Sequence, residues 1–581
     1  MALSPVPDLT SPGRPARLAA AIAVLMALVQ VVRGHANLGV TLGDTDDALR
    51  LVMVRGLIEG RGWFDATVHR LQPPDGVDMH WSRLVDGGLA ALDRLFALFV
   101  APETAEIWMR LVWPLLFLFP FALGAVLTAR RLGGSVAVLA AAIFIACFPV
   151  LIQFAVGRID HHNVQMALAM LMLAGAANPE TRWGPWLAGI STGLLLAVGL
   201  EGLIFAAIAG GAIALRFAAN ADFAPVARRY AMALGVTTGA AFLVQTPPRL
   251  WSATACDVLS VNLVAGIAAA CIGLFAARFA RRPAARILAI VVAGIAAACV
   301  YVALDPACLR GPYAYMNPDL RPIWLDHVSE VQTWPDLLRT RPALAAMLAA
   351  PIVMALAASM ALLRRPDIWR DPAWLTLFAI FMASVLSGFY MIRMLSYSAA
   401  FAAIVLAVAF ARFLPTRLAK SFIAVALAAF LISPAIVTPL AARLGTVWQE
   451  NGQAETSSPD VCRASASYDV LKMLPPGLFL ADIDAGPHLL AHTPHSALAA
   501  PYHRMNRGIA AAHDIWSAPP REAESKLRAD GIAYVMLCPK RGKLPIRFDE
   551  ASLRARLEAG DMPDYLESVP GGDVFKVWRV R

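Results

Sequence analysis

Three short strings place acidic residues and histidines beside long apolar segments of this 581-residue chain. They read GDTDDALR from Gly43 to Arg50, GRIDHHNV from Gly157 to Val164 and HVSEVQT from His327 to Thr333. Ionisable side chains beside hydrocarbon are costly, which favours a functional role for them. A carboxylate from each string and an imidazole from the middle one would supply the oxygen and nitrogen ligands of a divalent-metal site.

The first string contains Asp44, Asp46 and Asp47, and Arg50 follows Asp44 by six residues. Carboxylates at the start of a helix can accept hydrogen bonds from free backbone N–H groups and interact favourably with the helix dipole. Three acids within four residues exceed what capping needs, so we expect a catalytic or metal-binding role as well. On a helix, Asp44 and Asp47 would share one face.

The second string ends the loop before an apolar segment with Asp160, His161 and His162. A lone histidine in this place is more often a satisfied residue of the membrane interface. An Asp-His-His run offers two kinds of metal ligand within one turn, which is a moderately specific pattern. Arg158, beside this run, could bind a phosphate or neutralise the aspartate.

The remaining candidates are single polar residues at the ends of apolar segments. Glu330, preceded by Ser329, lies in a long loop, where a glutamate is usually solvated surface. Arg393 could extend its guanidinium to the membrane interface, or grip an anionic headgroup through two hydrogen bonds. Glu201, between two apolar runs, could be a simple polar residue of a hairpin.

Composition identifies a polytopic α-helical membrane protein. The chain is 59% hydrophobic and only 16% charged, whereas a soluble domain carries about 25% charged residues. Apolar stretches close to the roughly 20 residues that cross a bilayer recur up to Leu440. The net charge of +9 comes mostly from arginines in short loops between these stretches, which argues against a nucleic-acid partner and marks the cytoplasmic side.

The apolar stretches predict about thirteen transmembrane helices. They are expected at 17–33, 107–128, 134–152, 162–177, 185–200, 202–217, 228–245, 257–277, 287–303, 342–363, 373–391, 395–412 and 419–440. With the N-terminus in the cytoplasm, the arginine-rich loops alternate as the positive-inside rule requires. All eleven histidines then fall outside or at the outer membrane edge. We therefore expect a bacterial-type inner (plasma) membrane protein with a periplasmic C-terminal region.

Two domains are expected. Residues 1–444 form a transmembrane catalytic domain with long external loops at 34–107 and 305–341, and residues 445–581 form a small extracytoplasmic α/β domain. Strand-like runs at 477–483, 532–538 and 574–579 alternate there with helical patterns at 465–474 and 521–530. Cys462 and Cys538 flank this region, and an oxidising compartment would allow them to pair.

Taken together, these strings resemble the catalytic subunit of oligosaccharyltransferase, in the GT-C superfamily of polyprenyl-linked sugar transferases. The similar segments are Asp44 to Arg50, Pro74-Asp75-Gly76 through Leu84-Val85-Asp86, Asp160 to His162, Val328 to Gln332, and Arg393 with Tyr397. They occur in the family's order and on the side of the membrane that it uses. The resemblance implies a GT-C fold of about thirteen helices with a soluble external C-terminal domain.

The resemblance also implies an activity, namely transfer of a sugar from a polyprenyl-phosphate or -diphosphate donor at the outer leaflet. Asp44, Asp160, His162 and Glu330 would hold Mg²⁺ or Mn²⁺, since their ligand atoms are mostly oxygen. Arg393 and Arg158 would bind the donor phosphate, and Asp47 or Asp46 would orient or deprotonate the acceptor. His161, Ser329 and Arg50 are further candidates for this site.

The acceptor is where the chain departs from the family. The family's Trp-Trp-Asp-Tyr-Gly motif, which reads the Ser or Thr of a protein acceptor, has only Ala481-Asp482-Ile483-Asp484-Ala485-Gly486-Pro487 as its counterpart. This difference favours a glycan or lipid acceptor over a protein asparagine. A transporter or flippase is the alternative from another class, but the acids cluster at one face and no inverted repeat is visible.

Overall fold

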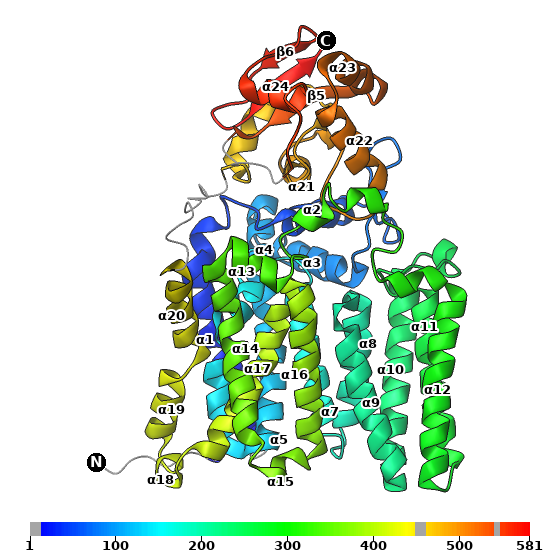
Figure 1. The fold of residues 1–581 in the computed structure, drawn as a ribbon, viewed down its shortest axis with the longest axis vertical. Coiled ribbons are helices and arrows are strands. Elements are labelled where there is room, and N and C mark those ends of the chain that lie inside the picture. Colours follow the sequence, from blue (N-terminus) through cyan, green and yellow to red (C-terminus); the bar gives the residue numbers. More distant parts are fainter. Residues whose placement is uncertain (1–7, 9–12, 448–460, 540–545) are drawn as a thin grey trace.

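The computed structural model describes residue 8 and residues 13–447, 461–539 and 546–581. The start of the predicted 445–581 domain therefore lies partly outside the described residues. Figure 1 shows a bundle of helices running side by side, with the C-terminal region stacked on one end of it and α2 (Thr45–Ile58) and α3 (Arg83–Phe96) between the two. The short helices α15 (Pro366–Trp369) and α18 (Thr416–Ala419), which lie in predicted cytoplasmic loops, are at the opposite end.

The apolar helices lie between Arg14 and Val447. They are α1 (Arg14–Gly34), α4 (Pro102–Leu116), α5 (Leu118–Phe144), α6 (Phe148–Leu151), α7 (His162–Ala177), α8 (Gly184–Val198), α9 (Leu203–Ala219), α10 (Ala224–Gln245), α11 (Val261–Ala276), α12 (Pro283–Leu304), α14 (Pro342–Leu362), α16 (Pro372–Tyr390), α17 (Leu395–Phe413), α19 (Phe422–Leu431) and α20 (Pro434–Val447). Among the described residues, nine helical segments are long and apolar enough to cross a membrane, and α7 and α8 are shorter apolar helices. A polytopic helical fold is thus confirmed, whereas the count of thirteen is not.

Prolines move three predicted helix boundaries. A proline ring clashes with the carbonyl of the residue four positions earlier and has no N–H to donate to it, so a helix is interrupted there. Pro120 lies just after the junction between α4, which ends at Leu116, and α5, so the predicted helix over 107–128 covers parts of two helices. A break in α5 at Gly134 (φ 63°) coincides with the predicted start of the next helix at 134. Pro149 similarly ends the predicted 134–152 helix early, with α5 stopping at Phe144. The predicted 419–440 helix is likewise two helices, because Pro434 opens a new one.

Helix α17 occupies the centre of the bundle. Every residue from Leu395 to Phe410 is buried, and the helix packs against α5, α14 and α16. Many of these residues are alanines, which allow neighbouring helices to approach closely. The short helix η10 (Ile392–Met394) precedes α17 and carries Arg393, so the position of this central helix sets the position of that arginine.

The first of the two loops predicted to be external contains α2, β1 (Thr67–Val68), β2 (Val77–Asp78) and α3. The second contains short 3₁₀ turns and α13 (Trp334–Thr340). Helix α2 packs against α21 (Ala485–His492) of the C-terminal region, and one hydrophobic core is built from both. Leu49 and Val52 belong to that core together with Leu489 and Leu490, so the first loop forms the base on which the C-terminal region sits.

The C-terminal region is a small α/β unit, as predicted. Its elements are η11 (Ser465–Met473), β3 (Leu478–Leu480), α21, β4 (Ser496–Ala497), α22 (Asn506–Ser517), α23 (Pro520–Ala529), β5 (Ile532–Leu537), α24 (Leu553–Ala559), β6 (Leu566–Val569) and β7 (Lys576–Val580). The sheet order is β4-β3-β5-β7-β6, with β3 parallel to β4 and β5, and β7 antiparallel to β5 and β6. Cys462 and Cys538 form a disulfide, and so do Cys256 and Cys308.

Candidate active site at the end of the bundle beneath the C-terminal region

The first predicted string begins helix α2. Asp44 is its N-cap and accepts hydrogen bonds from the backbone N–H groups of Asp46 (3.0 Å) and Asp47 (3.1 Å). Asp47 completes a capping box by accepting from the Asp44 N–H at 3.2 Å. Asp44 and Asp47 therefore share one face of the helix, as predicted, and capping accounts for part of their chemistry.

Asp47 also joins helix α2 to the Asp-His-His loop. Its Oδ1 accepts hydrogen bonds from the N–H groups of Ile159 (2.8 Å) and Asp160 (3.0 Å), and the residue is 1% exposed. Both oxygens of Asp47 are thus engaged within the protein. Asp46 differs, because its carboxylate has no hydrogen bond or ion pair among the described residues and is only partly buried. Of the three aspartates, Asp46 is the freest to meet an acceptor.

Arg158 lies among three aspartates. Its Nη1 pairs closely with Asp44 and lies 3.8 Å from Asp47 Oδ2, and its Nη2 lies 3.6 Å from Asp160 Oδ2. From the sequence, we expect Arg158 either to bind a phosphate or to neutralise an aspartate. These contacts agree with the second interpretation. A donor phosphate that bound Arg158 would have to compete with three carboxylates.

The two histidines of the second string contact Asp160. His161 Nδ1 lies 2.6 Å from Asp160 Oδ1, and His162 Nε2 lies 3.5 Å from Asp160 Oδ2. His161 Nε2 also lies 3.5 Å from an oxygen of Glu201. His162 Nδ1 is buried and has no hydrogen-bond partner in the described part of the chain, so it retains an unused lone pair or proton.

Glu201 is the centre of a network of polar side chains. From the sequence alone, this residue could be a simple polar residue of a hairpin. It accepts a hydrogen bond from Gln165 Nε2 at 2.7 Å and lies 3.6 Å from Arg393 Nη1. The Tyr397 hydroxyl donates to Gln165 Oε1 at 2.9 Å, and Arg393 Nη2 donates to the Tyr313 hydroxyl at 3.1 Å. The signal was present in the sequence, since a carboxylate between two apolar runs is rarely idle.

Backbone hydrogen bonds connect the loop over 305–341 to the segment that carries Arg393. The N–H of Arg393 donates to the carbonyl of Glu330 at 3.2 Å, and the N–H of Ile392 donates to that of Gln332 at 3.1 Å. These two bonds bring the backbone of Glu330 beside Arg393, at the edge of the same cluster. Ser329, another candidate, is exposed.

Arg50 is fully buried beneath the cluster. Its Nη1 donates to Asp86 Oδ1 at 2.7 Å, and its Nη2 lies 3.7 Å from Asp160 Oδ1. The guanidinium stacks over Trp81 at 4.5 Å, and Arg83 pairs with the other Asp86 oxygen at 3.2 Å. Asp86, the last residue of a segment quoted in the resemblance, thus positions Arg50 against Asp160.

The predicted metal ligands lie around one cluster, but their ligand atoms are not gathered within 4.8 Å of one another among the described residues. The donor set nevertheless suits a hard divalent cation. Burial, followed by the charges of Asp160, Asp44 and Glu330, raises the pKa of Asp46 well above its usual range. A divalent cation would relieve this crowding of carboxylates, and His162 Nδ1 offers a free nitrogen beside them.

No family model and no curated protein sequence matches the chain. Several solved structures do. An oligosaccharyltransferase from Archaeoglobus fulgidus, AglB in complex with an inhibitory peptide and a dolichol-phosphate, has a TM-score of 0.62 at 16% identity, over 90% of this chain and 69% of that one. A structure of an A. fulgidus oligosaccharyltransferase tethered with an acceptor peptide containing the NVT sequon has a TM-score of 0.62 at 15% identity, over the same shares.

A third structure is ArnT from Cupriavidus metallidurans bound to undecaprenyl phosphate. The match covers 97% of both chains at 13% identity, with a TM-score of 0.45. The two archaeal structures match the membrane helices and the C-terminal region as one unit, because 90% of this chain is aligned to them. The chain therefore has the same fold as the archaeal oligosaccharyltransferase, as the resemblance of its loop motifs implied.

Proposed function

We propose that this protein is a GT-C glycosyltransferase that moves a sugar or oligosaccharide from a polyprenyl-phosphate or -diphosphate donor to an acceptor at the outer face of the inner membrane. The observation that carries the proposal is the polar cluster of Asp44, Asp160, His162, Glu201 and Arg393 at the outer end of a GT-C bundle. A dolichol-phosphate bound to the archaeal enzyme of this fold supports a lipid phosphate as donor.

The donor phosphate would bind Arg393. Its guanidinium is held between Glu201 and the Tyr313 hydroxyl, which fixes its direction at the membrane end of the cluster. Guanidinium groups bind phosphate through two parallel hydrogen bonds, and they keep their charge at every relevant pH. Tyr397, through Gln165, holds Glu201 in place.

In the transfer step, the acceptor atom bonds to the anomeric carbon while the bond from that carbon to the phosphate oxygen breaks. The bonding electrons leave with the lipid phosphate, and the acceptor's proton passes to a carboxylate. Asp46 is better placed for this role than Asp47, whose oxygens are occupied by backbone N–H groups. Asp44, Asp160, His162 and Glu330 would hold Mg²⁺ or Mn²⁺, which when bound would neutralise charge on the leaving phosphate.

The acceptor is proposed to be a glycan or lipid. Asp482, in the segment that replaces the family's tryptophan motif, forms a buried ion pair with Arg554. Ile483 and Ala485 provide no hydrogen-bonding side chain for a hydroxyl residue. Transfer to a protein asparagine is the second candidate, because a structure of the same fold holds an acceptor peptide with a sequon.

We further propose that residues 1–444 are the membrane catalytic domain and that residues 445–581 are a periplasmic domain, with the N-terminus in the cytoplasm. The disulfide between Cys462 and Cys538 supports an oxidising compartment for the C-terminal region. A reporter fused after Arg581 should be active only outside the cytoplasm.

The test begins with lipids from a strain that lacks the gene, in which an unused lipid-linked sugar should accumulate and be identified by mass spectrometry. Purified full-length protein should then consume that lipid. Asp160→Ala and Arg393→Ala should lower turnover by about 100-fold or more, because each removes charge stabilisation from the reacting groups. Arg339→Ala, in the same external loop system but 79% exposed, should not. Identical lipid pools with and without the gene would refute the proposal, and efficient transfer to Asn-x-Ser/Thr peptides would refute the acceptor.

A further inference from the structure

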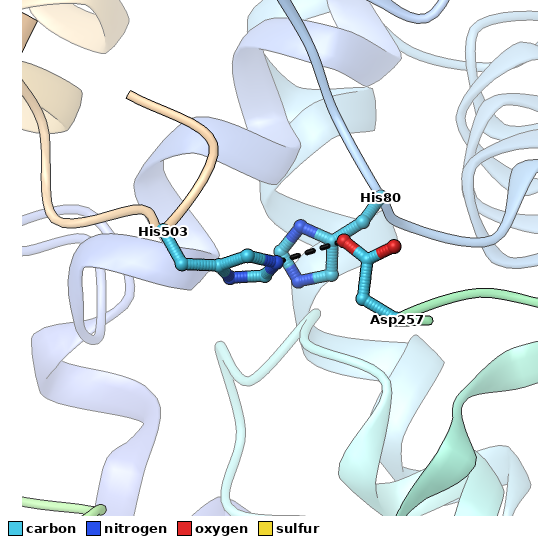
Figure 2. A group of neighbouring side chains, drawn as sticks. All are labelled: His80, Asp257 and His503. Carbon is cyan, nitrogen blue, oxygen red and sulfur yellow. Dashed lines mark hydrogen bonds and ion pairs between the residues drawn. The ribbon is translucent and has the colours of Figure 1, made fainter. Parts of the chain in front are cut away.

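A second group of potential metal ligands lies apart from the aspartate cluster. His80 follows β2 in the first external loop, Asp257 precedes α11, and His503 lies between β4 and α22 of the C-terminal region. One ligand atom from each lies within 4.8 Å of the others. Figure 2 shows the three side chains converging from three different segments, with the His80 ring beside that of His503.

The contacts within this group leave ligand capacity unused. His503 Nε2 lies 2.8 Å from Asp257 Oδ2, and the His80 and His503 rings are 4.5 Å apart. His80 Nδ1 is buried without a hydrogen-bond partner in the described part of the chain. A buried polar atom without a partner is costly, and a bound cation would remove that cost.

The carboxylate of the group is held rigidly from outside. Arg504 donates to Asp257 Oδ2 and to Asp257 Oδ1, both at 2.8 Å. A carboxylate has about four lone-pair positions, so two such bonds fix its plane and leave positions for an ion. The neighbouring residue, Cys256, is bonded to Cys308, which restrains the loop that carries Asp257.

We propose that His80, Asp257 and His503 bind one zinc-class divalent cation, with water completing its coordination. Two imidazoles and one carboxylate are the ligands that Zn²⁺ commonly takes, in contrast to the oxygen-rich set around Asp44. On binding, His503 coordinates the ion through Nε2 as a neutral imidazole with its proton on Nδ1, and its contact with Asp257 is replaced by the bond to the ion. The side chains of Asp257 and His503 are only 10% and 12% exposed, so the site is enclosed but reachable.

The ion would connect three parts of the chain that frame the proposed active site. Trp81, next to His80, lies under the Arg50 guanidinium and packs edge-on against Tyr502 at 5.4 Å. The His503 ring packs against Tyr313 at 5.3 Å, and Tyr313 accepts the hydrogen bond from Arg393. The bound ion is therefore a positioning element, which holds the C-terminal region and the first loop beside the phosphate-binding arginine.

The test uses the full-length protein in detergent, stripped of metal, in the Asp160→Ala background. That background removes a ligand of the proposed active-site metal, so the two sites cannot be confused. Zinc is titrated against a chromophoric chelator, and bound zinc is counted by mass spectrometry. We expect one zinc ion per chain, and Co²⁺ at the same site should show the absorption of a tetrahedral complex.

His80→Gln and His503→Gln should each weaken zinc binding by more than about 100-fold, since even the loss of an outer hydrogen-bond partner costs 10–100-fold. His69→Gln is the matched control, because His69 lies in the same loop but is 56% exposed and pairs with Asp65. Zinc should also raise the melting temperature of the parent and of the His69→Gln variant, and not that of His80→Gln. Gel filtration shows which variants are folded. Equal zinc affinity in all folded variants, or no zinc bound by the parent, would overturn the proposal.

Discussion

Arg70 joins the first external loop to the C-terminal region, and its replacement should loosen that junction. Its guanidinium donates hydrogen bonds to three backbone carbonyls, those of Leu490 (2.8 Å), Thr493 (2.8 Å) and His495 (2.9 Å). Two of these carbonyls lie at the C-terminal end of α21, where a cation also interacts favourably with the helix dipole. Arg70→Met keeps the aliphatic stem and removes all three bonds.

The expected loss can be worked out from these contacts. A hydrogen bond to a charged group contributes about 1.5–3 kcal/mol, so three bonds sum to roughly 4.5–9 kcal/mol. Arg70 is only partly buried, and water can reach the freed carbonyls, which reduces the sum. We therefore expect Arg70→Met to destabilise the docked state by about 3–5 kcal/mol. The opening equilibrium of the junction should rise by roughly 100-fold or more.

Hydrogen–deuterium exchange of the purified protein measures this opening directly. Peptides that cover α21 and β4 should lose protection in Arg70→Met, while peptides from α17 should not change. Arg507→Met is the matched control, because Arg507 also bridges the two regions by pairing with Asp75, but both side chains are more than half exposed. Arg507→Met should destabilise the docked state by less than about 1 kcal/mol. If both variants exchange alike, the buried carbonyl contacts are not what holds the junction.

Three further perturbations test other contacts. Asp86→Asn leaves the fully buried Arg50 without its carboxylate; it should cost about 3–5 kcal/mol, and an unchanged melting temperature would contradict this. Burial, followed by nearby cations, lowers the pKa of His492 from 6.5 to about 4, so stability that is complete above pH 6.5 is lost as the pH falls towards 4. Between pH 7 and 5.5 the free energy of unfolding of the wild type should fall by about 1 kcal/mol more than that of His492→Gln, measured by thermal shift. Equal losses in both proteins would exclude His492 as the source of this pH dependence. Cys462→Ser opens a disulfide across 76 residues; it should cost about 2–5 kcal/mol and cause faster proteolysis of the C-terminal region, and reductant should reproduce the effect with Cys538 still present.

Much of the fold follows from patterns within single segments. Apolar runs located most membrane helices to within a few residues, for example α14 at Pro342–Leu362 against a prediction of 342–363. The strand at 532–538 and the helix at 521–530 were also found, because their periodicities are local. The errors arose where one proline, such as Pro149, outweighed the hydropathy of its neighbours.

The sequence singles out most members of the candidate site but not the contacts between them. Asp44, Asp160 and His162 stand out because charged groups at apolar edges are rare. That Arg158 pairs with three aspartates, or that Asp47 accepts hydrogen bonds from Ile159 and Asp160, depends on how α2 packs on a distant loop. No spacing along the chain records such contacts.

The burial of α17 has a consequence for how the protein can vary. Most residues of the segment Ile392–Phe413 are buried, whereas few residues of Pro283–Leu304 are, because that helix lies at the edge of the bundle with one face against α11 and the other exposed. Bulkier side chains can replace those on the exposed face of α12, such as Leu288 and Val292, without displacing a neighbouring helix, whereas its other face packs against α11. A single added methyl group on α17 must instead shift a packed helix and, with it, Arg393 and Tyr397. Mutational tolerance should therefore rise from the centre of the bundle to its edge, and sequence drift at α17 should register first as altered donor affinity, before any loss of insertion into the membrane.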